Sequence, residues 1–166
     1  ISLPSEIEGI SLVWKSLSPK VALDDGTVYA DAEGLIATYV VTATIEGHTV
    51  EMSKEIEIPY LNTNSIDWCW STYYSKKVPA QTASNINYLW KNYASDTCSV
   101  VGYESSNTNV ISHKGEVFQQ VFDQYATVTC YLKIGKVINS YSQEVKVLAY
   151  TPNQRLEMVV DWLPSV

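Results

Sequence analysis

The sequence predicts an all-β protein made of two tandem antiparallel β-sandwiches, and three observations support this. Runs rich in Val, Ile, Thr and Tyr alternate apolar and polar residues, which is the pattern of half-buried strands. Turn dipeptides containing Gly separate these runs about every ten residues. The same order of motifs occurs twice along the 166 residues, a length that suits one large domain or two small ones.

The repeat has a constant offset of 89 residues. The segment WKSLSPKVALDDGTVY, from Trp14, matches YESSNTNVISHKGEVF, from Tyr103. Further matches at this offset are Ala37-Thr38 with Ala126-Thr127 and Ser53 with Ser142. Upstream, Leu3-Pro4 match Val78-Pro79 at an offset of only 75. We therefore expect the second copy to carry about 14 extra residues within 81–97.

Each copy is expected to contain the same strands in the same order. Ile10, Leu12 and Trp14 alternate along a first strand. The dipeptides Asp25-Gly26 and Lys114-Gly115 then form tight turns. Two long runs follow in the first copy, 35–46 and 49–58, with Gly47 at their hairpin turn, and Gly135 takes that place in the second copy.

The predicted organisation is a first domain over 1–59, a second over 60–150 and a C-terminal strand or stub over 151–166. Pro59 closes the first copy, because proline cannot donate a hydrogen bond within a ladder. Residues 60–77 either begin the second sandwich or form its edge. Residues 155–162 alternate as one more strand. The chain begins within a motif, so we expect it to be a piece of a longer protein.

An apolar stripe predicts a helix inside the extra residues. With Ser84 as its N-cap, the segment 84–93 places Ile86, Leu89, Trp90 and Tyr93 at i, i+3, i+4 and i+7. This spacing favours a helix lying on the second sandwich over a flexible loop, and Tyr88 and Asn92 would face outward.

These motifs resemble those of bacterial Ig-like domains, in particular the short, atrophied kind. The elements that carry the resemblance in the first copy are Leu3-Pro4, Trp14-Lys15-Ser16, Ser18-Pro19-Lys20-Val21 and Asp25-Gly26-Thr27-Val28. The resemblance covers about 1–58 well and 98–148 more loosely. The second copy departs from it with Tyr103 for the Trp and Lys-Gly-Glu-Val for the Asp-Gly-Thr-Val.

The resemblance implies two tandem Ig-like antiparallel β-sandwiches from a secreted or surface-anchored bacterial protein. Family members mostly act as spacers or adhesive modules, so the implied role is a non-catalytic scaffold that is extracellular or on the cell surface. The implied partners are adjacent modules of the same chain, a glycan or a surface protein. A fold alone dictates no function, so residues must decide between these roles.

Composition limits the possible functions. Apolar residues make up 46% of the chain and charged residues 17%, below the roughly 25% that is usual. The net charge is −7, and Arg155 is the single arginine beside ten lysines. No nucleic acid is expected as a partner, because its phosphates require basic patches. No apolar run reaches the roughly 18 residues of a membrane helix, so no membrane insertion is expected.

No catalytic group, cofactor or metal is expected. Asp24, Asp25, Asp31 and Glu33 are a candidate Ca²⁺ cluster, but the loop lacks the spacing of oxygen ligands that calcium sites use. A hairpin turn with solvated carboxylates is the favoured interpretation. The two histidines, His48 and His113, fit no two-ligand spacing and no nucleophile motif.

Three cysteines leave the disulfide pairing open. Cys130 has the apolar parity of its strand, and Cys98 begins the strand that corresponds to the Ile10 strand. The preferred pair is therefore Cys98–Cys130, facing across the sandwich, with Cys69–Cys98 as the alternative. Three buried free thiols are a further possibility, and an odd count leaves at least one thiol unpaired.

Aromatic residues are the candidate ligand-binding groups. If 68–70 is a strand, Trp68 and Trp70 lie on one face, where two indoles can stack on sugar rings. The candidate ligand-binding residues are Trp68, Trp70, Tyr73, Tyr74, Tyr88, Trp90 and Asn92. The alternative is that these rings pack in the core or between domains, because each buries about 150–250 Å². A carbohydrate-binding module is thus the second functional hypothesis beside the scaffold.

Overall fold

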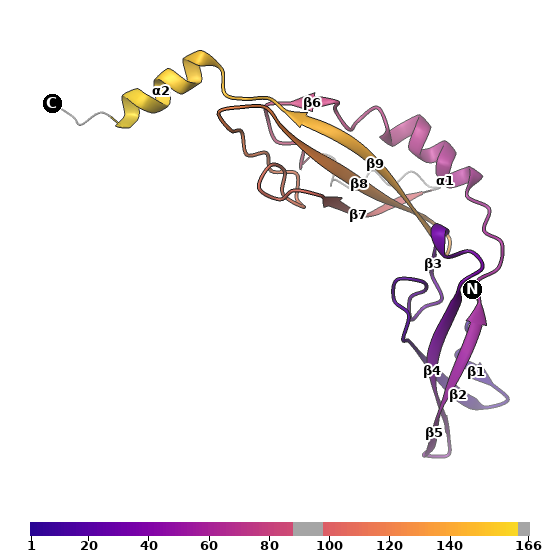
Figure 1. Cartoon of the computed structure of the whole chain (residues 1–166). Helices are drawn as coiled ribbons and strands as arrows, with labels where there is room; N and C mark the ends of the chain where they lie inside the picture. Colours follow the sequence, from indigo (N-terminus) through magenta and orange to yellow (C-terminus); the bar gives the residue numbers. More distant parts are fainter. Residues whose placement is uncertain (88–97, 163–166) are drawn as a thin grey trace. The chain divides into compact units, whose positions relative to one another are not determined.

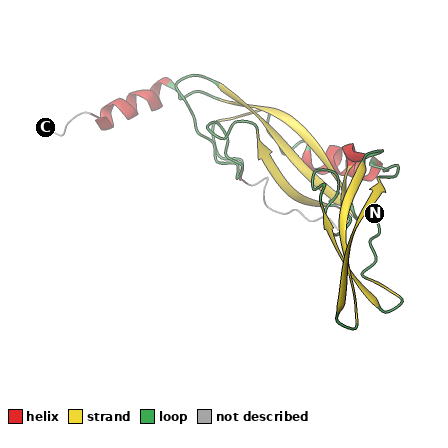
Figure 2. Ribbon diagram, turned by 60° about the horizontal axis from the view of Figure 1, so that its bottom comes forward, coloured by secondary structure: helices red, strands yellow, loops and turns green. Residues whose placement is uncertain are grey.

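A computed structural model describes residues 1–87 and 98–162. Strands occupy 43% of the described residues and helices 17%, and the strands form two sheets. The predicted β character is therefore confirmed at that level, and Figure 2 shows how the strands predominate. Among the residues described, no helix is long and apolar enough to cross a bilayer.

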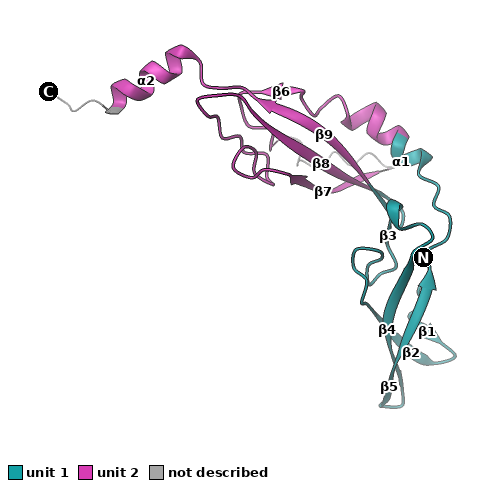
Figure 3. Ribbon diagram, viewed as in Figure 1, with its two compact units in different colours: residues 1–67, 133–139 teal, residues 68–132, 140–166 magenta. Residues whose placement is uncertain are grey.

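The chain separates into two compact units, coloured apart in Figure 3. The first comprises residues 1–67 and 133–139, and the second comprises residues 68–132 and 140–166.

The sheet of the first unit has the order β1-β2-β4-β5 (Figure 1). Its strands are β1 (Glu6–Ile7), β2 (Ile10–Ser16), β4 (Ile36–Ile45) and β5 (His48–Glu57), all antiparallel to their neighbours. The hairpin between β4 and β5 turns through Glu46 and Gly47, both with positive φ, as a two-residue type I′ turn requires. One face of this sheet packs on a buried cluster of Ala22, Val28, Ala32, Ala37, Tyr39 and Ile58.

The short strand β3 (Val28–Tyr29) completes the first unit. It pairs in parallel with Val137 and Ile138 of β9 (Val137–Val147), at the start of that strand. A 3₁₀ turn (Ala30–Ala32) leads from β3 towards β4 and buries Ala32.

The second sheet continues from β3 and β9 to β8 (Gln124–Ile134) and β7 (Ser99–Ser105), and β6 (Gln81–Thr82) pairs in parallel with the end of β9. Buried residues alternate along β8, in the period of two that the sequence predicts. The buried residues of this alternation are Ala126, Val128, Cys130 and Leu132.

The sequence repeat is also a repeat of strands and hydrogen bonds. β2 and β7 have equal length and begin 89 residues apart, and β5 and β9 also begin 89 residues apart. In the first copy an isolated bridge joins Ala22 to Val28, and in the second a bridge joins Ile111 to Val117. The Gly26 nitrogen donates to the Leu23 carbonyl, and the corresponding Gly115 nitrogen donates to the Ser112 carbonyl. The turn is therefore built in the same way twice.

The upstream match at offset 75 is wrong in the structure. The Ile1 nitrogen donates to the Gly26 carbonyl at 2.7 Å, and the Ile86 nitrogen donates to the corresponding Gly115 carbonyl at 2.8 Å. Ile1 and Ile86 are thus equivalent, at an offset of 85. The segment from Ile86 to the start of β7 is therefore four residues longer than the segment from Ile1 to the start of β2.

Two segments predicted as strands are helices. Residues 64–69 form α1 (Asn64–Cys69), which runs into a π-helical turn (Trp70–Tyr74). The C-terminal segment forms α2 (Pro152–Trp162) instead of one more strand. The Thr151 hydroxyl accepts from the Gln154 nitrogen at 3.3 Å, and the Gln154 side chain accepts from the Thr151 nitrogen at 2.8 Å. This reciprocal capping box, with proline at the first helical position, starts α2.

We predict that Gly26→Ala destabilises the chain more than Gly47→Ala does. Both glycines have positive φ, which costs a residue with a Cβ about 1–2 kcal/mol. A Cβ at Gly26 would also collide with the Ile1 carbonyl, whereas one at Gly47 meets nothing within 4 Å. We expect losses of about 1 kcal/mol for Gly47→Ala and about 3 kcal/mol for Gly26→Ala, measured by denaturant unfolding. Equal losses would show that the close approach to Ile1 has no energetic weight.

Candidate functional site

The aromatic candidates lie on a helical segment that begins at Thr63. The Thr63 carbonyl accepts from the Ile66 and Asp67 nitrogens, and the Thr63 hydroxyl donates to Asp67 Oδ2 at 2.9 Å. The Ser75 nitrogen donates to the Trp70 carbonyl, an i+5 bond that closes the π-helical turn. The segment therefore stays helical from α1 through Tyr74.

The prediction that Trp68 and Trp70 share one face is wrong because it assumed a strand. A helix turns about 100° per residue, so side chains two positions apart point in very different directions. A helical signal is present in the sequence: Ile66, Cys69 and Tyr74 follow helical spacing, and all three are buried.

Trp70 is used for internal packing. Its ring stacks on Tyr141 of β9 with centroids 4.9 Å apart and planes 7° from parallel. Stacked aromatic pairs of this kind add about 0.5–1.5 kcal/mol to stability, beyond the free energy gained by burying their apolar surface. One face of the Trp70 indole is therefore occupied by the protein itself.

Trp68 and Tyr73 form the exposed aromatic pair. Trp68 is 54% exposed and Tyr73 is 42% exposed. Their centroids lie 5.4 Å apart and their planes stand at 88°. An edge-to-face pair presents no flat two-ring platform, so at most one of these faces can stack on a sugar ring.

Tyr74 belongs to the interior and not to a binding surface. It is buried, as are Tyr103 and Cys130. Burial raises the pKa values of the Tyr74 and Tyr103 hydroxyls. Burial also raises the pKa of the Cys130 thiol to about 11, although a hydrogen bond from Tyr103 acts in the opposite direction. The Cys130 thiol is consequently protonated and shielded at neutral pH.

The disulfide joins Cys69, at the end of α1, to Cys98, just before β7. The preferred Cys98–Cys130 pair is therefore wrong, and the alternative pairing forms. Cys130 is a buried free thiol, which fits its position on the inward face of β8, where a thiol behaves as a small apolar side chain. The two bridged cysteines are 29 residues apart in the sequence, so the bridge ties the end of α1 to the chain just before β7.

The remaining aromatic and polar candidates, Tyr88, Trp90 and Asn92, lie outside the described residues, as does most of the helix predicted over 84–93. In the described part, Ile86 is buried. Asn85 Oδ1 accepts from the Val117 nitrogen at 2.8 Å. The corresponding Val28 nitrogen in the first copy donates instead to the Lys136 carbonyl, in the turn just before β9.

Three of the four acidic residues in the candidate calcium cluster, Asp24, Asp25 and Glu33, accept hydrogen bonds from backbone nitrogens. Asp24 Oδ1 accepts from the Ser16 nitrogen at 2.7 Å, and Glu33 Oε2 accepts from the Leu61 nitrogen at 3.1 Å. At the position of Asp24 in the second copy, His113 Nδ1 accepts from the Ser105 nitrogen at 3.1 Å. Within the described ranges, no group of three His, Cys, Asp or Glu side chains is placed to hold a metal ion.

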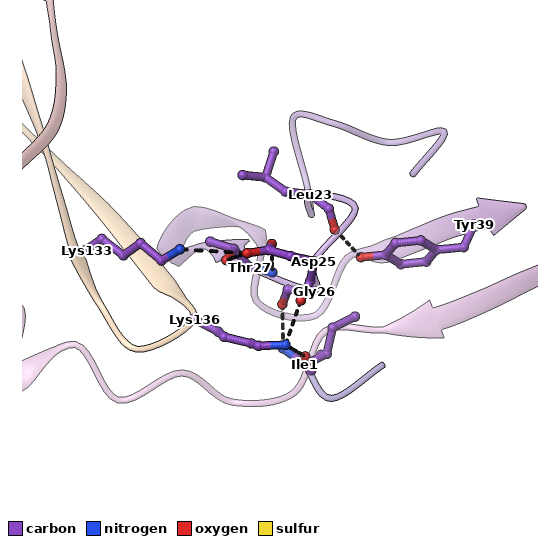
Figure 4. A network of polar contacts seen from close by, with 8 residues as sticks. All are labelled: Ile1, Leu23, Asp25, Gly26, Thr27, Tyr39, Lys133 and Lys136. Carbon is purple, nitrogen blue, oxygen red and sulfur yellow. Dashed lines mark hydrogen bonds and ion pairs between the residues drawn. The ribbon is translucent and has the colours of Figure 1, made fainter. Parts of the chain in front are cut away.

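A polar network around the Asp25-Gly26 turn was not predicted (Figure 4). Asp25 accepts from the Thr27 nitrogen at 2.8 Å and from the Thr27 hydroxyl at 3.0 Å. Lys136 Nζ donates to the carbonyls of Asp25, at 2.6 Å, and of Ile1, at 3.4 Å. Lys133 lies 3.8 Å from the Asp25 carboxylate. Both lysines lie more than 100 residues from the turn along the chain, so no local pattern could reveal their contacts with it.

The network is suited to holding chain segments together. The pKa of Asp25 lies below its ordinary value because of the hydrogen bonds from Thr27, with smaller contributions from Lys133 and Lys136. The Asp25 side chain is largely exposed, so the ion pair itself contributes little. On the opposite side of the turn, the Tyr39 hydroxyl donates to the Leu23 carbonyl at 3.0 Å.

Comparisons with family models, with curated proteins and with solved structures found no match for this chain.

We predict one reactive thiol per chain after denaturation without reductant, and none in the native state. Cys130 is buried and has a raised pKa, so it resists alkylation at pH 8, while Cys69 and Cys98 are oxidised. Iodoacetamide labelling followed by peptide mass spectrometry checks both points. Labelling of Cys69 in the unfolded, unreduced chain would contradict the pairing.

We predict that Asp25 makes folding stability dependent on acid pH. Because its folded-state pKa is lowered, ionised Asp25 stabilises the fold above the ordinary carboxyl value near about 4. This contribution disappears as the pH falls through the lowered pKa. Asp25→Asn should therefore flatten the fall in unfolding free energy between about pH 5 and pH 2, measured by urea denaturation. Glu6→Gln, at an exposed strand position, is the control and should leave the profile unchanged.

Proposed function

We propose that the chain is a non-catalytic pair of Ig-like modules that acts as a spacer or adhesive scaffold in a secreted or surface protein. The observation that carries the proposal is the stacking of Trp70 on Tyr141, together with the burial of Tyr74. The rings best suited to a ligand are engaged in holding the helical segment against the sheet. Aromatic residues used in this way support a rigid structural element.

The repeated turn supports the modular part of the proposal. Two segments with low sequence identity build the same bridge and the same turn hydrogen bonds around Gly26 and Gly115. Such conservation of backbone pattern within one chain is typical of tandem modules. The Ig-like assignment itself rests on the sequence motifs.

The disulfide supports an exported location. Bonds such as Cys69–Cys98 form and persist in oxidising compartments and are rare where thiols are kept reduced. Cys130 is compatible with that setting because it is buried and protonated.

A carbohydrate-binding module is the alternative, and one observation favours it. Trp68 and Tyr73 are exposed side by side on the same helical segment. Either ring offers an apolar face to the C–H face of a sugar, with polar atoms nearby.

Affinity electrophoresis on a panel of polysaccharides separates the two functions. The scaffold role predicts unchanged mobility on every gel, for the native chain and for Trp68→Ala. Retardation of the native chain that is lost in Trp68→Ala would establish the alternative. Tyr60→Ala is the matched control, because Tyr60 is an exposed aromatic residue that belongs to the other compact unit.

A further inference from the structure

The inner face of β9 is covered by the segment that runs from α1 to Val78. Three contacts lie along alternate residues of the strand. Asn139 donates to Asp67 Oδ1 at 3.1 Å, Tyr141 stacks on Trp70, and Gln143 donates to the Val78 carbonyl at 3.1 Å. Further along the same face, Val145 and Val147 are fully buried.

The corresponding face of β5 is exposed in the part of the strand that carries Val50 and Met52. The offset of 89 residues makes Val50 the equivalent of Asn139 and Met52 the equivalent of Tyr141. Val50 is 61% exposed and Met52 is 54% exposed. Both lie on the core side of the sheet, since Met52 pairs with the buried Val41. The first copy therefore presents apolar side chains where the second copy presents side chains that contact a helix.

The chain also contains a helix, α2, whose apolar side chains are exposed among the described residues. α2 follows β9 much as α1 follows β5, and Thr151 and Thr63 each stand directly before the first helical residue. Every described side chain of α2, from Pro152 to Asp161, is exposed. Leu156, Val159 and Val160 form an i, i+3, i+4 stripe. A pocket of about 510 Å³ lies between α2 and Val121, and its lining is almost wholly apolar.

The charges beside the two apolar surfaces, the β5 face and the α2 stripe, are complementary. Lys54 lies on the face of β5 that carries Met52, two residues further along the strand. On α2, Glu157 and Asp161 flank the apolar stripe, against the single positive charge of Arg155. A helix with this excess of acid fits beside a lysine.

We propose that α2 of one copy of the chain docks on the open inner face of β5 in a second copy. The contact is heterologous, because each chain offers a helix from its second unit and a sheet face from its first unit. Such a contact links copies head to tail. The inference goes beyond the scaffold role and does not depend on whether a glycan binds.

Sedimentation of the intact chain over a range of concentrations tests the proposal. We expect the average mass to rise with concentration. Met52→Lys on the sheet face and Val159→Lys on α2 should each weaken association by at least about tenfold, because each places a charge in an apolar contact. Both positions are exposed, so the variants should fold, which circular dichroism checks. A native chain that remains monomeric up to about millimolar concentration overturns the proposal.

Val13→Lys is the matched control. Val13 is 63% exposed on the same sheet but on the opposite face, since it pairs with Thr42, the outward neighbour of Val41. The control should associate like the native chain. Equal weakening by Val13→Lys would overturn the proposed surface.

Mixing the two variants tests the head-to-tail geometry. The Met52→Lys chain keeps an intact helix, and the Val159→Lys chain keeps an intact sheet face. Each alone should be monomeric, and an equimolar mixture should form a one-to-one dimer. An interface between two helices or between two sheet faces predicts no association in the mixture. That result would overturn the head-to-tail contact.

Discussion

The need to cover one apolar sheet face governs this structure. A small antiparallel sheet is stable only if its inward side chains leave water, and each copy has few residues with which to achieve this. Around β9, a helical segment lies along the strand, and the Cys69–Cys98 bridge ties that segment to the chain before β7. Around β5, the core is complete near Ala37 and Tyr39 but ends before Val50. The two copies thus share a backbone plan and differ in what completes it.

The acidic residues of the first copy illustrate how charge is used here. Asp24, Asp25 and Glu33 each accept a hydrogen bond from a backbone nitrogen that the strands leave unpaired. Carboxylates are effective in this role because an ionised acceptor forms the stronger hydrogen bonds. A dense group of carboxylates in this chain therefore marks a tight turn. His113 performs the same task in the second copy with a ring nitrogen.

The aromatic residues divide into structural and available groups. Trp70, Tyr141 and Tyr74 hold the helical segment on the sheet, while Trp68 and Tyr73 remain at the surface. The proposed scaffold and the alternative glycan site differ only in the use of this second pair. The exposed stripe of α2 belongs to neither, and it is the feature that most clearly points to a partner.

The sequence alone determined the β class, the positions of the long strands and the repeat of 89 residues, because alternation and glycine turns are local properties. It also contained the signals for both helices, in the spacing of Ile66, Cys69 and Tyr74 and in the Thr-Pro-Asn-Gln box before α2. Runs of β-prone residues outweighed those signals.

Only the tertiary structure decided the pairing of Cys98 and the contacts of Lys136 with the Asp25 turn, since both depend on which distant segments meet. The same holds for the open face at Val50 and Met52: the pattern of β5 shows which side chains share a face, but burial depends on whether another segment packs there.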